Sequence, residues 1–568
     1  MKIKYGWGCE ADSSIHIAAL GIDMQGIETS QKPRAFIKQR LSQKQRTPLR
    51  RVILRLICFI LIGIVVLPIL YLGIRALSAG DEAIDYLLKP RTLTIMANSI
   101  ALMVSVMVSA CLIGVPFAYL TTRSDLYFRR VWLILGLLTM VIPSYLGAAT
   151  FLEMFGMTGM LAQALAPLGI DRLLDIRGFG GTWIVMTLFT YPFVVLPVRS
   201  ALIDMDPALE EAARSLGLGP WAVFRRVTLA QLRPAITAGL TLTALYALSD
   251  FGIVAMMRFN AFTRAIYLNY TSSFNREQAA VLALVLIGVV MILLQFERFI
   301  ASSHQNYKVG TGTKRKTKQV KLGKWQLPAL LFTSLLAFLG VGVPVLVLAN
   351  WLTGRTMIDA VPVAMTELAS NTVSVSIATA IVVAISAIPL ALLATRGKTR
   401  FDRWVIQIGY AGNVLPGLVI ALAMVFFAAN YLPEIYQSAP LLIIGYSIRY
   451  LPLSIGATRS SLSQINPRLE EAARSMGVGP WRTLWRITFP LARTGIIAGA
   501  VLVFLNVMRE LPITLMLSPI GFRTFANRIW SVYGEGMLVL IGQPGLVLLG
   551  VSGLVLLLLL WRDKHLSQ

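Results

Sequence analysis

Two short charged stretches in a largely apolar chain carry the residues best suited to binding a partner. The sequence reads DPALEEAARSLGLGPW at 206–221 and NPRLEEAARSMGVGPW at 466–481, and twelve of these sixteen positions are identical. Asp206 and Asn466 are favourable helix N-caps, the following proline suits the first helical position, and Gly217 and Gly477 suit the helix end. The pattern predicts the same helix of about ten residues twice, about 15 Å long at 1.5 Å per residue.

The predicted helix has one apolar face and one charged face. Apolar residues recur at i, i+3, i+4 and i+7, and on the other face a glutamate precedes an arginine by four residues, which is a favourable pairing. A helix this short is marginal alone, so it must dock on something. One possibility is lipid, with Trp221 and Trp481 as anchors. Lipid accepts many apolar sequences, so the repetition favours a protein partner that meets two equivalent surfaces. The apolar positions are Leu209, Ala212, Ala213 and Leu216, repeated as Leu469, Ala472, Ala473 and Met476.

Two carboxylates, Asp250 and Glu510, are also related by an offset of 260 residues. Each falls late in an apolar segment, and a carboxylate inside a membrane span is by default a candidate functional group. Two such groups would suit a hard cation, which prefers oxygen ligands, and would equally suit an organic cation. The alternative is that both lie near the outer interface, with Arg509 neutralising Glu510.

Other chemistry is poorly supported by the sequence. The three cysteines have no CxxC spacing and the three histidines are isolated, so no metal centre is predicted and metal ligands are left unassigned. A phosphate-binding loop requires two glycines around four residues before Lys-Ser/Thr. RGKTR at Arg396 has Leu392 in place of the first glycine. We therefore expect no ATP hydrolysis, no enzyme activity and no bound cofactor in this chain.

The elements that position these groups are membrane helices. The chain has 568 residues, 56% of them apolar, and a mean hydropathy of +0.71. Lipid forces each span to satisfy its own backbone, so an all-α polytopic protein is predicted. The twelve predicted spans are 52–76, 95–121, 131–153, 182–203, 233–256, 278–297, 326–350, 371–395, 404–428, 439–459, 491–514 and 538–561.

Charge predicts the orientation of these spans. Residues 32–55 carry nine Lys or Arg and no acid, whereas the first outside loop, GDEAIDYLL from Gly80, is acidic. The positive-inside rule then places both termini and both charged repeats in the cytoplasm. The net charge of +25 resides in these short loops, so nucleic-acid binding is not expected.

The repetition extends over the whole chain. Asn98 begins a segment that matches one beginning at Asn371, and equivalent points are six spans apart, so the repeats are parallel. An extra 13 residues in the first repeat are assigned to the outside loop 154–181. The predicted organisation is a basic cytosolic tail at 1–51, a first six-helix repeat at 52–300, a basic linker at 301–325 and a second repeat at 326–565.

The charged repeats resemble the EAA signature of permease subunits of binding-protein-dependent ABC importers. The first copy departs from the signature at its final proline, where Ala230 stands, and the second has Phe489 in place of leucine. The resemblance implies a type I importer permease of MetI-like fold in the bacterial inner membrane, a cytosolic ABC ATPase dimer that uses ATP and magnesium, and a periplasmic binding protein. It implies that the ATPase-coupling residues are Glu210, Glu211, Ala212, Ala213 and Gly217, with Glu470, Glu471, Ala472, Ala473 and Gly477.

The segments that contain the two carboxylates, 248–270 and 509–530, resemble the iron(III) branch of these permeases. The resemblance implies ferric ion as cargo, although related fused permeases carry thiamine or aminophosphonates. A secondary transporter would have no use for a duplicated cytosolic docking helix. A channel, a scaffold or a membrane enzyme explains that helix no better.

Overall fold

The computed structural model describes residues 49–78, 80–272, 276–302, 319–354, 365–397, 399–410, 412 and 415–562. The contacts between residues divide the chain into two compact units, Met1–Ile53 and Leu54–Gln568. The structure describes the first unit only from Leu49, where helix α2 begins. The elements described lie in the second unit, apart from the first residues of α2. The predictions for the basic tail and for most of the basic linker lie outside the described residues.

The described residues form helices, as predicted, and their one extended pairing is an isolated bridge between Ser124 and Val320. The first repeat contains α2 (Leu49–Leu77), α3 (Asp81–Leu88), α4 (Pro90–Arg123), α5 (Arg129–Leu138), α6 (Ser144–Phe155), α7 (Met160–Leu165), α8 (Phe179–Asp204), α9 (Pro207–Ser215), α10 (Pro220–Val223), α11 (Leu229–Ser249), α12 (Gly252–Met256), α13 (Phe262–Thr271) and α14 (Arg276–Ser302). The second contains α15 (Gln326–Ala337), α16 (Val343–Thr353), α17 (Met365–Arg396), α18 (Arg400–Gly409), α19 (Gly417–Tyr431), α20 (Ala439–Ser463), α21 (Pro467–Ser475), α22 (Pro480–Thr483), α23 (Phe489–Met508), α24 (Pro512–Leu517), α25 (Phe525–Gly534) and α26 (Gly542–Arg562).

Short π-helical and 3-10 segments interrupt or extend several of these helices. The π-helical segments are η3 (Phe224–Thr228), η5 (Phe338–Gly342) and η9 (Leu484–Thr488). The 3-10 segments are η1 (Thr139–Val141), η2 (Ala166–Leu168), η4 (Gly323–Trp325), η8 (Pro433–Ile435) and η10 (Leu538–Ile541).

Ten helices among the described residues are long and apolar enough to cross a membrane. The fifth and ninth of the twelve predicted spans are not among these ten. The fifth is α11, whose 21 residues include polar side chains near its start, such as Gln231 and Arg233. The ninth is shortened to α19, an apolar helix of 15 residues. Both segments are present as helices, but neither is the long apolar span that the sequence predicted.

The third and ninth predicted spans are each broken at an equivalent proline. Pro143 separates α5 and η1 from α6, and Pro416 immediately precedes α19. Proline cannot donate a backbone hydrogen bond, and it disfavours helical geometry in the residue before it. Hydropathy averaged over a window does not detect these breaks.

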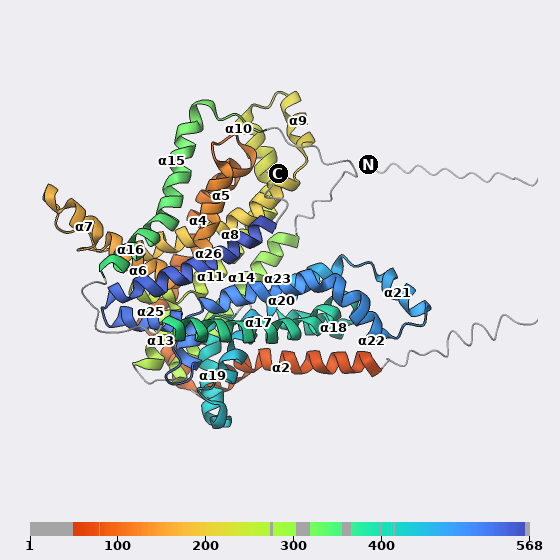
Figure 1. Ribbon diagram of the computed structural model, residues 1–568. Helices are drawn as coiled ribbons and strands as arrows, with labels where there is room; N and C mark the ends of the chain where they lie inside the picture. The colour runs from red at the N-terminus through yellow and green to blue at the C-terminus, as the bar shows by residue number, and fades with distance from the viewer. Residues whose placement is uncertain are drawn as a thin grey trace, which may run out of the picture. The chain divides into compact units, whose positions relative to one another are not determined.

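Each repeat is built around three helices that pack on one another. In the first repeat these are α4, α8 and α11, and in the second they are α17, α20 and α23 (Figure 1). The middle helix of each set is extensively buried, with 72% of the apolar window of α8 and 61% of that of α20 inside the protein. The internal repeat predicted from the sequence is therefore a repeat of packing as well.

The first helix of each repeat packs on the other repeat. In α2, the Tyr71 ring lies edge-on to Phe427 and Tyr431 of the second repeat, with centroids 6.0 and 6.1 Å away. In the second repeat, α15 packs on α5 and α16 packs on α6. The two sequence repeats are therefore interlocked, and their boundaries are not boundaries of separate bodies.

Polar contacts connect the start of α2, and the segment just before α15, to the other repeat. Arg55 of α2 donates to both carboxylate oxygens of Asp402, at 2.9 and 3.2 Å, in the first turn of α18. In the other repeat, Asp125, in the turn between α4 and α5, accepts the backbone N–H of Leu322 at 2.9 Å, shortly before α15 begins. The same arrangement thus occurs twice with different residues.

Candidate functional site

Both charged repeats fold as the capped helices predicted from the sequence. The Asp206 side chain accepts the N–H of Ala208 at 3.0 Å, and Asn466 accepts the N–H of Arg468 at 3.0 Å. Gly217 and Gly477 adopt φ of 85° and 77°, the left-handed region that glycine enters without steric cost. Each helix is followed by a second short helix, α10 or α22.

The apolar face of each charged helix is largely exposed. In α9, Leu209 is 56% exposed and Leu216, just past the helix end, is 84% exposed. In α21, Leu469 is 49% exposed, and Met476 beyond it is 74% exposed. The second alanine of each motif is buried against the protein, whereas the first alanine and the second glutamate are exposed; these are Ala213 and Ala473, Ala212 and Ala472, and Glu211 and Glu471. The exposed residues form two equivalent surfaces that nothing in the described chain covers.

The first glutamate of the first motif points into the protein. Glu210 is 8% exposed, and its Oε1 accepts a hydrogen bond from Thr228 of η3 at 2.7 Å. Arg123, the last residue of α4, lies 4.0 Å from the same oxygen, and Arg214 lies 3.7 Å from Oε2, which confirms the predicted i,i+4 pair. Glu210 therefore ties α9 to a membrane helix.

The second motif repeats this contact. Arg396, the last residue of α17, donates to Glu470 Oε1 at 3.1 Å, and Thr488 of η9 donates to the same oxygen at 3.3 Å. The side chain of Arg474 lies outside the described part of the chain. We call each set of Arg, Glu and Thr a motif clamp: Arg123, Glu210 and Thr228, and Arg396, Glu470 and Thr488.

The resemblance assigned both glutamates of each motif to ATPase coupling, and the clamps were not predicted. The sequence contained a signal for them, because Arg123 and Arg396 keep the 273-residue offset of the surrounding segments. Thr228 and Thr488 keep the 260-residue offset of the motifs. Only the fold shows that these two sets of repeated positions meet.

A cavity of about 560 Å³ lies between the two repeats and contains both predicted carboxylates. Asp250 and Glu510 are 8% and 7% exposed. Both follow the end of a helix, since α11 ends at Ser249 and α23 ends at Met508. The prediction that each lies inside a continuous span is wrong, because the chain leaves the helix at each carboxylate and starts a short helix, α12 or α24.

The charged lining of this cavity is balanced. Its charged residues are Asp250, Glu510, Arg449 and Arg509. Glu510 pairs with Arg449, whose Nε lies 3.5 Å from Oε2, and it accepts a hydrogen bond from the Tyr450 hydroxyl. Arg509, which the sequence offered as the neutralising residue, donates instead to the Met140 carbonyl and to Asn506. The described residues contain no group of three or more His, Cys, Asp or Glu that could hold a metal ion.

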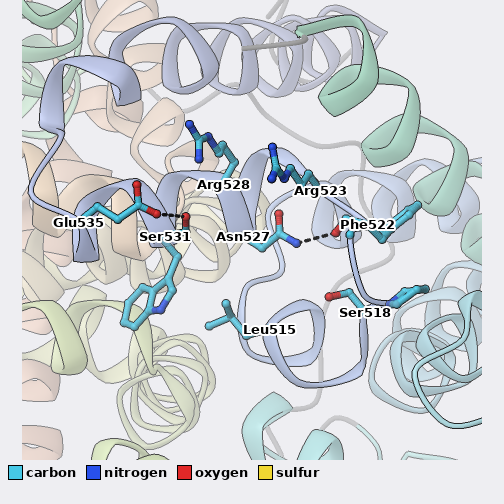
Figure 2. Close-up of a pocket in the computed structure, with 11 residues that line it drawn as sticks. Leu515, Ser518, Phe522, Arg523, Asn527, Arg528, Ser531 and Glu535 are labelled. Atoms are coloured by element: carbon cyan, nitrogen blue, oxygen red, sulfur yellow. Dashed lines mark hydrogen bonds between the residues drawn. The ribbon is translucent and has the colours of Figure 1, made fainter. Parts of the chain in front are cut away.

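A second cavity of about 410 Å³ lies around α25 and the loop before it (Figure 2). Arg523 and Arg528 both line it. Asn527 donates to the Phe522 carbonyl at 2.9 Å, and Ser531 donates to Glu535 at 2.9 Å. The sequence did not single out this cavity, which presents two guanidinium groups and one carboxylate.

The sequence matches the family described as binding-protein-dependent transport system inner membrane component, at residues 110–300 and again at 387–562. The chain belongs to this family. Each of the two matches contains one charged helix, one motif clamp and one of the two cavity carboxylates. The MetI-like permease fold and the duplicated family domain expected from the EAA signature are therefore confirmed.

Named relatives of this inner membrane component transport different solutes. The chain is 31% identical over 477 residues, 83% of this chain and 90% of the relative, to the Fe(3+)-transport system permease protein FbpB 2 of Haemophilus influenzae. It is 31% identical over 215 residues, 38% of this chain and 75% of the relative, to a probable molybdenum ABC transporter permease protein of Haloferax volcanii. It is 27% identical over 186 residues, 32% of this chain and 66% of the relative, to the sulfate transport system permease protein CysT of Escherichia coli.

Proposed function

We propose that this chain is the transmembrane permease of an ABC importer that translocates iron(III) delivered by a periplasmic binding protein. A separate cytosolic ABC ATPase dimer drives the transport through α9 and α21. This chain binds no cofactor and is not an enzyme, because ATP and magnesium are used by the ATPase. The domain limits predicted above, 52–300 and 326–565, define its two permease repeats.

One observation carries the coupling role. Each charged helix exposes an apolar and acidic surface while its inward glutamate is clamped to the end of a membrane helix, α4 or α17. A force applied to the exposed surface therefore reaches the membrane helices through Glu210 and Glu470. A helix that only rested on lipid would have no need of this connection.

The proposed orientation follows from the charges of the loops. Both termini and both charged helices lie in the cytoplasm, and the chain is a multi-pass protein of the bacterial inner membrane. The segment around α25 then lies on the outside. Its cavity, with Arg523 and Arg528, is the surface that we assign to the periplasmic binding protein.

Ferric ion is the favoured cargo because a match over 83% of the chain is to an Fe(3+)-transport permease, whereas the molybdenum and sulfate permeases match about a third of the chain. Thiamine and aminophosphonates are the other candidate cargoes. The cargo test measures ATP hydrolysis by the complete complex in nanodiscs. Stimulation by the ferric-loaded binding protein, and not by carriers loaded with molybdate, sulfate, thiamine or phosphonate, is the expected result.

The coupling role is tested by reversing the exposed charge on both helices, with Glu211→Lys and Glu471→Lys in one chain. The reversed charges repel the partner surface that the glutamates fit, so the ATPase should no longer copurify with the chain. Stimulated ATP hydrolysis and uptake should fall to the unstimulated level, while the protein still inserts in the membrane.

The matched control is Glu82→Lys with Glu434→Lys, which makes the same change in net charge at two exposed carboxylates away from the charged helices. The control should keep the ATPase bound. Normal uptake in the Glu211 and Glu471 variant would show that α9 and α21 do not couple the permease to its ATPase.

A further inference from the structure

Each motif clamp lies beside a contact with the chain of the other repeat. In the first repeat, Arg123 ends α4 and pairs with Glu210 of α9. The Arg123 carbonyl also accepts the N–H of Val320 at 2.8 Å. Val320 lies in the segment that leads through η4 into α15, the first helix of the second repeat. The residue that holds the charged helix is therefore bonded to the start of the other repeat as well.

Two further hydrogen bonds strengthen this contact. The N–H of Asp125 donates to the Val320 carbonyl at 3.2 Å, and the Asp125 carboxylate accepts the N–H of Leu322 at 2.9 Å. We call the four residues that join the end of α4 to the start of the second repeat the first junction: Arg123, Asp125, Val320 and Leu322. Because backbone groups make two of these three bonds, rotation of a side chain cannot release them.

The second repeat has an equivalent contact that is built from side chains. Arg396 ends α17 and pairs with Glu470 of α21. The next residue, Gly397, packs so closely on Asp402 that a Cβ added to it would lie 2.7 Å from the Asp402 Cβ. Asp402 is bound at both carboxylate oxygens by Arg55 of α2, a geometry that fixes orientation as well as distance. We call Arg396, Gly397, Asp402 and Arg55 the second junction.

The two junctions share their position but not their chemistry. The first consists mainly of backbone hydrogen bonds, and the second of a carboxylate and a guanidinium group. A tie that only held the repeats together could lie anywhere on the surface that they share. Both junctions lie instead at the end of the membrane helix that carries the clamp arginine. Their position therefore indicates a connection to the charged helices.

We propose that the two junctions make each charged helix act on both repeats. When the ATPase displaces α9, the clamp moves α4 of the first repeat and the first junction moves the start of α15. When it displaces α21, the clamp moves α17 and the second junction moves the start of α2. Contiguous packed and hydrogen-bonded groups are a physical means of carrying such coupling. The inference rests on the proposed function and makes Asp125 and Arg55 positioning residues that keep the two repeats in step.

The test disables one charged helix at a time in the complete complex. Glu211→Lys disables α9, and Glu471→Lys disables α21. Uptake into proteoliposomes is measured with the loaded binding protein that stimulates the unmodified complex, which we expect to be the ferric-loaded one. Each single variant should retain at least about a tenth of the unmodified uptake, a loss of no more than about 1.4 kcal/mol, because the remaining helix still moves both repeats.

Breaking the junctions in these two backgrounds should then give a crossed pattern. Arg55→Gln opens the second junction and leaves the cap of α18, Thr399 with Asp402, in place. Asp125→Ala with Val320→Pro opens the first junction, since proline has no N–H to donate. With α9 disabled, Arg55→Gln should lower the remaining uptake about fivefold or more, the low end of coupling between linked sites, and the first-junction variant should change it little. With α21 disabled, these two effects should be exchanged.

Each junction variant is the matched control for the other. A tie that merely stabilises the fold would lower uptake to the same extent whichever charged helix was disabled. Copurification of the ATPase with every variant checks that the complex is assembled. Equal effects of a junction variant in both backgrounds overturn the proposal. Complete loss of uptake in both single variants, Glu211→Lys and Glu471→Lys, overturns it as well.

Failure of the junctions and failure of the proposed function give different results. If the chain with both Glu211→Lys and Glu471→Lys loses the ATPase and uptake, but the crossed pattern is absent, the charged helices couple the permease and the junctions are only structural. If that double variant transports normally, the coupling role of α9 and α21 falls and the inference falls with it.

Discussion

At the scale of single residues, neighbouring glutamates of one motif have opposite environments. Glu210 and Glu470 face inward and are held by an arginine and a threonine, whereas Glu211 and Glu471 are exposed. The first pair connects the charged helices to the membrane helices, and the second pair lies on the surface that we assign to the ATPase. Substitutions at the two adjacent positions should therefore impair different properties, namely coupling at the inward glutamates and ATPase binding at the exposed ones.

Removing the charge of both inward glutamates, with Glu210→Gln and Glu470→Gln, should uncouple the two activities. Hydrogen bonds to a charged group contribute about 1.5–3 kcal/mol each, and every 1.4 kcal/mol corresponds to about tenfold in an equilibrium. We expect the ATPase to copurify normally while uptake per ATP hydrolysed falls about tenfold or more. Both are measured in the complete complex in nanodiscs.

The matched control for the clamps is Glu211→Gln with Glu471→Gln, which removes the same charge from the exposed positions. It should weaken ATPase binding and leave the ratio of uptake to hydrolysis unchanged. Arg123→Lys with Arg396→Lys keeps the positive charge of both clamps. If this variant lowers uptake per ATP hydrolysed less than the Glu210 and Glu470 variant does, the result supports a positioning role. Equal behaviour of the inward and exposed variants would show that the two kinds of glutamate have the same role.

At the scale of helices and turns, the contact between Arg55 and Asp402 links α2 to the second repeat. Burial alone would raise the pKa of the Asp402 carboxyl. The hydrogen bonds from Arg55 and Thr399, together with the Arg55 charge, outweigh it and hold that pKa below its usual range. A carboxylate with a lowered pKa stabilises the fold above its unfolded pKa of about 3.9, and this stabilisation is lost as the pH falls through the folded value.

The Asp402→Asn variant should therefore unfold more easily at neutral pH, by about 1–3 kcal/mol for the lost charged hydrogen bonds. The difference from the unmodified protein should shrink as the pH falls below about 4. Apparent melting temperatures from tryptophan fluorescence in nanodiscs, recorded across pH, measure both effects. Asp81→Asn, at an exposed aspartate, is the control that should change neither. A constant difference at all pH values would argue against the ion pair as its source.

The helix ends show what local sequence predicts well. The caps at Asp206 and Asn466 and the glycine stops at Gly217 and Gly477 follow from the conformational preferences of single residues, and the structure confirms them. The break at Pro143 was missed because a hydropathy window averages over it. The partner of Glu510 was also missed, because Arg449 lies 61 residues earlier and only tertiary packing brings it close.

At the scale of the whole molecule, the two repeats are interlocked because the first helix of each packs on the other. The polypeptide linker between the repeats should therefore contribute little to their association, because packing already holds them together. We expect residues 1–310 and 311–568, expressed as two chains, to assemble and to copurify through a tag on one of them. The assembled pair should keep ATPase stimulation.

The control for this split omits residues 1–78 from the first fragment, which removes α2 and its contacts with Asp402 and Phe427. Copurification should then be clearly reduced. Fragments that never associate, or that associate equally well without α2, would show that the crossing helices do not hold the repeats together.

The contact between Arg55 and Asp402 also sets an order of events during biosynthesis, because 347 residues separate its two ends. At about 5–20 residues per second, the ribosome needs roughly 20–70 s to make that length of chain. Throughout this interval α2 lacks its partners in the second repeat, although its Arg75 can already meet Glu277 of α14. The helix α2 is thus made early but reaches its neighbours in the second repeat late.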